Sequence, residues 1–226
     1  MNQIIKADFH VHGFCSPDSL SKGDDLVAKA KELGLGKLIL TDHNTIAGAV
    51  ELQKKYPDFV IVGEEILTTQ GEILALFVKE EIPKFTEPIE AFERLREQNA
   101  FISLSHPYAP MRHGWSEQEM IGYLPFIDAI EIANGRNMAE MNIAAKNFAE
   151  AHGLCGTAGS DAHDTSELGS MCLELPDFNN ADELRESIKT AKVVGKESPQ
   201  WVRYYSRKAV LFKAVNRIFH VKLYRD

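Results

Sequence analysis

Asp8-Phe-His-Val-His12, which follows the apolar pair Ile4-Ile5, has the composition of a buried β-strand. Side chains on a strand alternate between its two faces, so His10 and His12 project to the same side. Two imidazoles that share a face at a strand end can bind one metal ion. We therefore expect a strand that starts near Ile4 and presents this histidine pair at its carboxyl end.

More polar groups follow apolar stretches of strand length farther along the chain. They are Asp18, Thr41-Asp42-His43, Gly63-Glu64-Glu65, Ser105-His106-Pro107 and Gly159-Ser160-Asp161-Ala162-His163. Ligands of α/β sheets and barrels bind beyond the carboxyl ends of the strands, where loops from many strands converge. Imidazole and carboxylate together suit Zn, Mn or Fe, and the number of carboxylates favours several ions over one structural zinc.

Short apolar runs alternate with amphipathic helical stretches, which is the pattern of a parallel sheet covered by helices. About seven strands are expected, at 4–9, 37–41, 59–63, 72–78, 101–105, 127–132 and 154–158. Only 67–71 separates the third strand from the fourth, which is too short for a helical crossover, so these two strands should form a hairpin. A helix is predicted over 138–152, with Gly153 as its stop signal.

The chain of 226 residues is long enough for one buried core, and we expect a single domain. A net charge of −8 argues against an extended nucleic-acid-binding surface. The three cysteines are far apart in the sequence and odd in number, which argues against a disulfide framework. The sequence shows neither the features of a signal peptide nor an apolar run that approaches the ~18 residues of a membrane span, so a cytoplasmic protein without a membrane span is expected.

Residues after about 195 are expected to form a C-terminal helical tail that packs on the domain. The stretch 207–220 within it is basic and amphipathic. A packed helix with a solvated basic face explains this pattern, and contact with a membrane surface or with a partner is the alternative.

Taken in chain order, five motifs resemble those of the PHP (polymerase and histidinol phosphatase) superfamily. They are His10-x-His12 with Asp18, Thr41-Asp42-His43-Asn44, Gly63-x-Glu65, Ser105-His106-Pro107 and Gly159-Ser-Asp161-Ala-His163. The resemblance extends from Asp8 to about Leu175. It implies a distorted seven-stranded (β/α)7 TIM-like barrel with a trinuclear metal centre, and most characterised members of that superfamily hydrolyse phosphoesters.

The resemblance also implies which residues bind two or three divalent ions (Zn, Mn or Fe). One ion would be held by His10, His12, Glu65 and Asp161, a second by Glu65 and His106, and a third by Asp18, His43 and His163. Glu64 could replace Glu65 if the strand register differs by one residue. The superfamily usually has a further histidine after the Gly-x-Glu motif, and here Glu72 occupies that place. A carboxylate there would favour a harder ion such as Mn or Mg, or leave the second site weak or empty.

Other polar residues near these motifs are candidates for supporting roles. Arg112, His113, Asn134 and Arg136 are candidates to bind a substrate phosphate, whereas Asp8 and Asp42 are expected to support ligand histidines from behind. The resemblance implies a hydrolase that cleaves a small phosphorylated metabolite or a nucleotide with a metal-bridging hydroxide, without a side-chain nucleophile. The alternatives are an amide, carbamate or ester hydrolase, and a non-catalytic regulatory module that keeps the metals.

Overall fold

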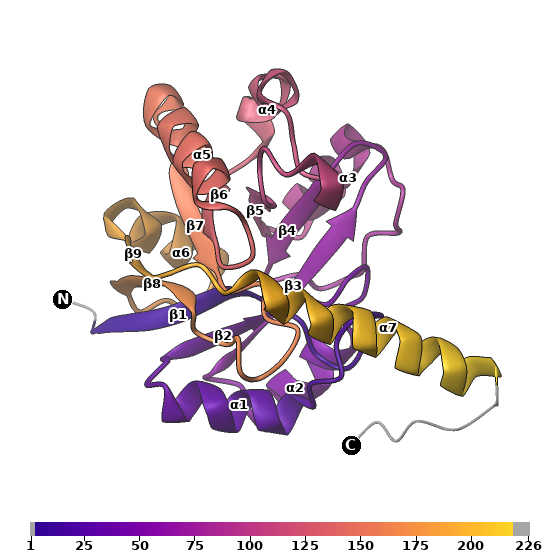
Figure 1. Ribbon diagram of the computed structural model, residues 1–226. Helices are drawn as coiled ribbons and strands as arrows, with labels where there is room; N and C mark the ends of the chain where they lie inside the picture. Colours follow the sequence, from indigo (N-terminus) through magenta and orange to yellow (C-terminus); the bar gives the residue numbers. More distant parts are fainter. Residues whose placement is uncertain (1–2, 219–226) are drawn as a thin grey trace.

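The computed structural model describes residues 3–218, in which nine strands form one mixed sheet of order β7-β6-β5-β4-β3-β2-β1-β8-β9 (Figure 1). The strands are β1 (Ile4–Val11), β2 (Lys37–Leu40), β3 (Val60–Leu67), β4 (Glu72–Leu76), β5 (Phe101–Leu104), β6 (Ala129–Asn134), β7 (Cys155–Gly159), β8 (Met171–Pro176) and β9 (Lys192–Gly195). The α-helices are α1 (Gly23–Glu32), α2 (Ala47–Lys55), α3 (Pro88–Glu97), α4 (Glu117–Tyr123), α5 (Ala139–His152), α6 (Ala181–Ser187) and α7 (Arg203–Ile218).

The sheet curls until it nearly closes into a barrel at β1. The first half of β1 pairs with β8, from Ile4 to Ala7. Its carboxyl end instead meets the segment after β7, where the amide of Asp161 donates to the carbonyl of His10 at 2.7 Å and the amide of His12 donates to Ala162 at 2.9 Å. The β7 edge of the sheet therefore meets β1, the strand that carries the histidine pair, while β8 and β9 continue the sheet on from β1.

The described residues contain two strands more than the seven expected. All seven expected strands are present, and β3 pairs with β4 in the antiparallel hairpin that the short connection predicted. The additional strands, β8 and β9, pair antiparallel with each other. β8 ends in a proline and β9 is a short, mostly exposed edge strand, so neither has the alternating pattern that identifies a strand in sequence.

Apolar side chains fill the barrel interior at the amino ends of the strands. Phe9, Ile39 and Phe101 belong to this buried cluster, and Leu184 of α6 packs into it. The pairing of β1 with β2 shifts in register between Asp8 and Val11, as at a β-bulge. Phe9 lies in the apolar cluster, while the polar residues gather at the carboxyl end of β1.

Helices cover the outside of the sheet, and α5 ends where the sequence predicted. α5 ends at His152, and Gly153 follows in a left-handed conformation with φ 65°. Gly34, with φ 72°, lies just beyond α1 in the same way. None of the helices within 3–218 combines the length and the apolarity that a bilayer crossing requires.

Gly159→Ala is expected to destabilise the fold by about 2 kcal/mol, because β7 and β1 approach most closely there. A Cβ at Gly159 would lie 2.3 Å from the Cβ of His10 and 2.5 Å from its backbone nitrogen. Thermal denaturation should show a midpoint roughly 4–8 °C lower. Gly122→Ala in α4 is the matched control, because its Cβ meets nothing within 4 Å. Equal midpoints for the two variants would contradict this account of the seam.

Candidate metal centre

Four buried atoms from three strand ends converge at the barrel mouth. Nε2 of His10 lies 3.2 Å from Oε2 of Glu65 and 3.8 Å from Oδ1 of Asp161. Nε2 of His12 lies 3.3 Å and 3.4 Å from the same two oxygens. Each of the four atoms is buried without a hydrogen-bond partner among the described residues.

This arrangement fits a divalent cation. Bonds of 2.0–2.2 Å to nitrogen and oxygen, arranged tetrahedrally, place neighbouring ligand atoms about 3.3–3.6 Å apart. The observed separations between these ligand atoms, 3.2–3.8 Å, include that range and extend slightly beyond it at both ends. Buried polar atoms without partners are costly, and one ion would satisfy all four at once.

The protonation states of two side chains in this cluster, His12 and Glu65, also suit a bound metal ion. Burial, followed by the neighbouring imidazoles of His163 and His43, lowers the pKa of His12 to about 3, so its ring is neutral. Burial alone would raise the pKa of Glu65, but the charges of His10 and His43 hold it well below its ordinary value. Neutral imidazole and ionised carboxylate are the forms that bind metals, and His12 and Glu65 already have them. Neighbouring carboxylates raise the pKa of His10 and of His43 in spite of their burial, so an ion would displace a proton from each of these two rings.

A second group of ligand-type atoms lies on the other side of Glu65. Nε2 of His106 is 3.0 Å from Oε1 of Glu65 and 3.2 Å from Oε2 of Glu72. Nδ1 of His43 lies 3.1 Å from Oε2 of Glu65 and 3.6 Å from Oε1 of Glu72. Glu72, the residue that departs from the superfamily pattern, therefore points into the cluster with only 8% of its side chain exposed.

A third group forms where the loop after β1 meets the loop after β7. Oδ2 of Asp18 lies 2.8 Å from Nε2 of His163 and 3.6 Å from Nε2 of His43. These are the three residues that the family resemblance implied as one ligand set. His43 spans two groups, because its Nε2 faces Asp18 while its Nδ1 faces Glu65 and Glu72.

Sequence reasoning missed Glu131, the carboxylate that orients the histidine pair. Its Oε1 lies 2.9 Å from Nδ1 of His10, and its Oε2 accepts hydrogen bonds from the backbone of His106 at 2.8 Å and from Asn134 at 3.0 Å. A glutamate inside an otherwise apolar strand, Ala129-Ile-Glu-Ile-Ala133, was the signal for it. Such partners fix the tautomer and orientation of a metal-binding imidazole.

Glu131→Gln is expected to weaken metal binding by roughly 10–100-fold, the usual cost of losing a partner behind a ligand. The amide keeps the shape of the side chain but removes the charge that holds Nδ1–H of His10. Metal affinity measured by competition with a chromophoric chelator would test this. Glu174→Gln on β8, whose half-buried side chain lies 3.8 Å from Lys6, serves as the control. Equal affinities in the two variants would show that Glu131 does not position His10.

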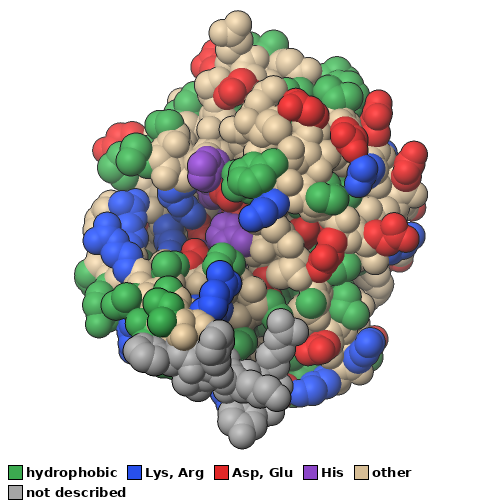
Figure 2. All heavy atoms as spheres, turned by 90° about the vertical axis from the view of Figure 1, so that its right-hand side faces the viewer, with side chains coloured by type: hydrophobic (Ala, Val, Ile, Leu, Met, Phe, Trp, Pro, Cys, Tyr) green, Lys and Arg blue, Asp and Glu red, His purple; other side chains and the backbone are tan. Residues whose placement is uncertain are grey.

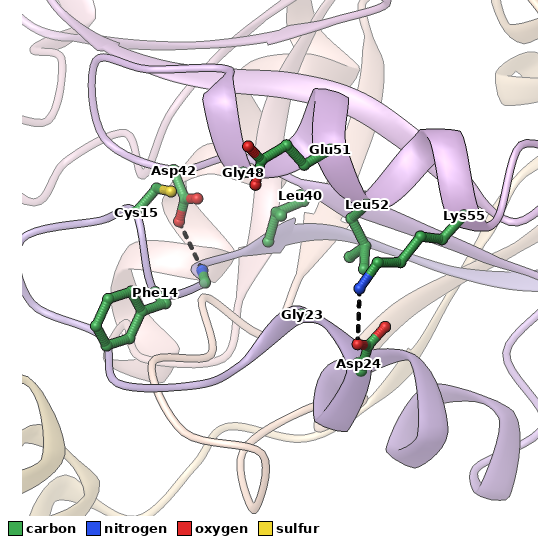
Figure 3. A pocket seen from close by; sticks show the side chains of 11 residues that line it. Phe14, Cys15, Gly23, Asp24, Leu40, Asp42, Gly48, Glu51, Leu52 and Lys55 are labelled. Carbon is green, nitrogen blue, oxygen red and sulfur yellow. Dashed lines mark hydrogen bonds and ion pairs between the residues drawn. The ribbon is translucent and has the colours of Figure 1, made fainter. Parts of the chain in front are cut away.

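Asp8 and Asp42 support the backbone of the loops rather than the imidazoles. Asp8 accepts hydrogen bonds from Ser160, from its amide at 2.9 Å and from its hydroxyl at 2.6 Å, and also from the amide of Gly169 at 2.9 Å. Asp42 accepts from the amide of Gly13 at 2.6 Å, beside a cavity of about 90 Å³ between α1 and α2 (Figure 3). Both carboxylates therefore hold the loops that carry predicted ligands.

The register of β3 distinguishes Glu65 from Glu64. Glu65 faces the histidines, whereas Oε2 of Glu64 accepts from the amide of Ile82 at 3.2 Å and its Oε1 has no partner among the described residues. Burial raises the pKa of Glu64 from 4.5 to about 8. Glu64 thus lies on the opposite side of the strand from the cluster.

Glu64→Gln is expected to stabilise the protein at pH 8 and to have little effect near pH 4.5. Between these values the folded chain keeps a proton on Glu64 that the unfolded chain releases, so the free energy of unfolding of the wild type falls as pH rises. The gain at the upper limit should be on the order of 2–4 kcal/mol. Denaturant titrations across this window test it, and a difference that does not change with pH would contradict the assignment.

The four predicted substrate residues lie in different environments. Arg112 contacts Asp161 and donates to Oδ1 of Asn134 at 3.3 Å, so both Arg112 and Asn134 lie beside the cluster. His113 is exposed, and its carbonyl accepts from the amide of Glu72 at 3.0 Å. Figure 2 shows histidine and acidic side chains inside a hollow that Lys and Arg side chains border.

The structure places Arg136, the fourth candidate for substrate binding, in a buried ion pair. Its guanidinium is buried and donates to both oxygens of Glu167 at 2.7 Å. Glu167 in turn accepts from the amide of His163 at 3.2 Å. Arg136 therefore holds the loop that carries His163, a pairing between distant segments that a single sequence does not reveal.

Fold and site together define an α/β barrel whose mouth gathers histidines and carboxylates that could hold metal ions. A model of the PHP domain matches residues 8–93, and a model described as PHP-associated matches residues 139–193.

Two uncharacterised proteins of Methanocaldococcus jannaschii are similar to this chain. One is 39% identical over 120 residues, which are 47% of this chain and 70% of the relative. The other is 32% identical over 180 residues, which are 77% of this chain and 72% of the relative. The chain belongs to the PHP family.

Solved structures support the fold. The chain resembles a structure from Bifidobacterium adolescentis, whose proposed activity is that of a metal-dependent phosphoesterase, with a TM-score of 0.62. The match covers 80% of this chain and 94% of that one at 17% identity. At this identity the likeness shows a shared fold, which agrees with the nearly closed, barrel-like sheet.

Proposed function

We propose that the chain is a metal-dependent phosphoesterase that acts on a small phosphorylated metabolite or a nucleotide. The observation that carries this proposal is the set of four buried, unpartnered atoms of His10, His12, Glu65 and Asp161, which face one another at 3.2–3.8 Å. The name of the structural neighbour from Bifidobacterium adolescentis agrees with it.

Three adjoining groups of residues would hold two or three divalent ions. The first is His10, His12, Glu65 and Asp161; the second is Glu65, Glu72 and His106; the third is Asp18, His43 and His163. Glu65 joins the first two groups, because its Oε2 faces His10 and His12 while its Oε1 faces His106. When bound, such ions activate water near neutral pH and neutralise the charge of a phosphoryl group.

The chain's own residues would orient the ligands and bind the substrate. Glu131 keeps the Nε2 atom of His10 directed at the cluster through its contact with Nδ1. Arg112 would bind a phosphoryl oxygen, since a guanidinium matches phosphate geometry with paired N–H donors. The side-chain oxygens of Asn134 and Asn137 accept from Arg112 at 3.3 Å and 3.2 Å, which holds the guanidinium beside Asp161.

Turnover and metal content test the proposal together. Purified protein would be supplied with Mn, Zn or Fe and offered phosphomonoesters, phosphodiesters and short oligonucleotides, while bound metal is quantified by mass spectrometry. Metal-dependent release of phosphate or cleavage of a diester is expected. Hydrolysis of amides or carboxylic esters without hydrolysis of any phosphoester would show that the centre catalyses a different reaction, and it would overturn the proposal. Full metal occupancy without turnover of any substrate would support a regulatory module and overturn the proposal.

A further inference from the structure

The last described helix differs in charge from the rest of the chain. Between 203 and 218 the sequence has five basic residues and no acidic one, although the whole chain has a net charge of −8. The helix crosses the front of the molecule and extends beyond the barrel (Figure 1). A basic helix on an acidic protein indicates an anionic partner.

One side of α7 is anchored to the loops around the candidate metal centre. Ala209 is buried, and Nζ of Lys213 donates to the carbonyl of Phe14 at 2.6 Å and to that of Ser16. The hydroxyl of Ser206 accepts from Arg136 at 2.5 Å. These contacts fix which side of the helix faces the barrel.

The opposite side carries an exposed apolar stripe. Tyr204, Leu211, Val215 and Ile218 are 63%, 67%, 41% and 71% exposed, and their spacing places them along one side of a helix. Arg207 and Lys208 flank the stripe in the helical arrangement. We call these six residues the outer face of α7.

An aromatic residue extends the outer face at its amino end. Trp201, in the short turn just before α7, is 63% exposed. Trp and Tyr prefer the boundary between water and lipid, because they combine an apolar ring with a polar edge. Trp201 and Tyr204 therefore add the residue types that are typical of an interfacial helix.

We propose that the outer face of α7 docks on an anionic lipid bilayer. An apolar stripe with flanking Lys and Arg and with aromatic residues at one end is the pattern of a helix that lies in the plane of a membrane surface. Pairing of two copies through this face would bring basic residues against basic residues, which is unfavourable. The inner contacts of α7 would hold the loops around the candidate metal centre on the side of the helix that faces away from the bilayer.

Vesicle sedimentation tests this proposal without reference to hydrolysis. The chain of 226 residues would be mixed with vesicles of phosphatidylcholine alone or of equal parts phosphatidylcholine and phosphatidylglycerol, at low and high salt. Binding to the anionic vesicles alone, weakened by salt, is expected. The variant Arg207→Glu/Lys208→Glu should bind roughly tenfold or more weakly. Leu211→Ser/Val215→Ser should also weaken binding.

A matched control tests whether vesicle binding depends on the outer face of α7 or on any exposed apolar side chain. Ile143 on α5 is 59% exposed, and Ile143→Ser should leave vesicle binding unchanged. Equal binding to neutral vesicles would overturn the proposal, as would an effect of Ile143→Ser as large as that of Leu211→Ser/Val215→Ser. Absence of vesicle binding, together with concentration-dependent self-association that Leu211→Ser abolishes, would assign the face to a second copy instead.

Discussion

Asp161→Asn is expected to lower hydrolase activity by about three orders of magnitude, equivalent to ~4 kcal/mol in the activation barrier. Oδ1 of Asp161 lies 3.4 Å from Nε2 of His12 and 3.8 Å from that of His10, where a shared ion would bind. Its other oxygen accepts from Asn134 at 3.0 Å and contacts Arg112. An amide has the same shape but lacks the negative charge that attracts both the ion and the guanidinium.

The substitution is a clean test because the backbone should not change. Asp161 has φ 55°, in the left-handed region that asparagine adopts as readily as aspartate. Metal analysis should show at least one ion fewer per chain, together with the loss of turnover. Asp164→Asn, three residues farther along the same loop, should retain both. Normal metal content and normal turnover in Asp161→Asn would show that Asp161 is not a ligand of the metal centre.

The strand that carries His10 and His12 could be predicted because burial and alternation are local properties. An apolar run followed by spaced histidines specifies both the strand and the face. The same logic located Glu65 and His106 at strand ends, and the structure brings them within 3.0 Å of each other. Strand ends meet in a curled sheet, so residues that are far apart in sequence lie close together there. The positions of the motifs at strand ends therefore predict which side chains are neighbours.

Pairings between segments that lack a motif could not be predicted. Glu131 and Arg136 lie on the same strand end, but one bonds to His10 and the other to Glu167. Which partner each one meets depends on how β6 sits against β7 and on the position of α7. Likewise β9 is a strand because β8 offers it an edge, while its own sequence, Lys-Val-Val-Gly, is too short to specify one.

Glu72→Gln is expected to lower activity by roughly 100-fold and to reduce the number of bound ions, since it removes a charge from the second group of ligand atoms. Oε2 of Glu72 lies 3.2 Å from Nε2 of His106, and Oε1 lies 3.6 Å from Nδ1 of His43. The backbone of Glu72 is held independently of its side chain, because its amide donates to His113 at 3.0 Å and its carbonyl accepts from Trp115 at 2.6 Å. The effect should therefore reflect the carboxylate itself.

Glu64→Gln is the matched control, because Glu64 is a buried glutamate of the neighbouring strand that faces away from the cluster. It should retain activity and metal content. Glu72→His adds a second measurement, because it restores the residue type that the superfamily usually has at this place. Imidazole suits Zn and carboxylate suits Mn or Mg, so activity in this variant should recover with Zn and remain low with Mn. If Glu72→Gln and Glu64→Gln behave alike with every metal, Glu72 is not a ligand, and the centre holds its ions without it.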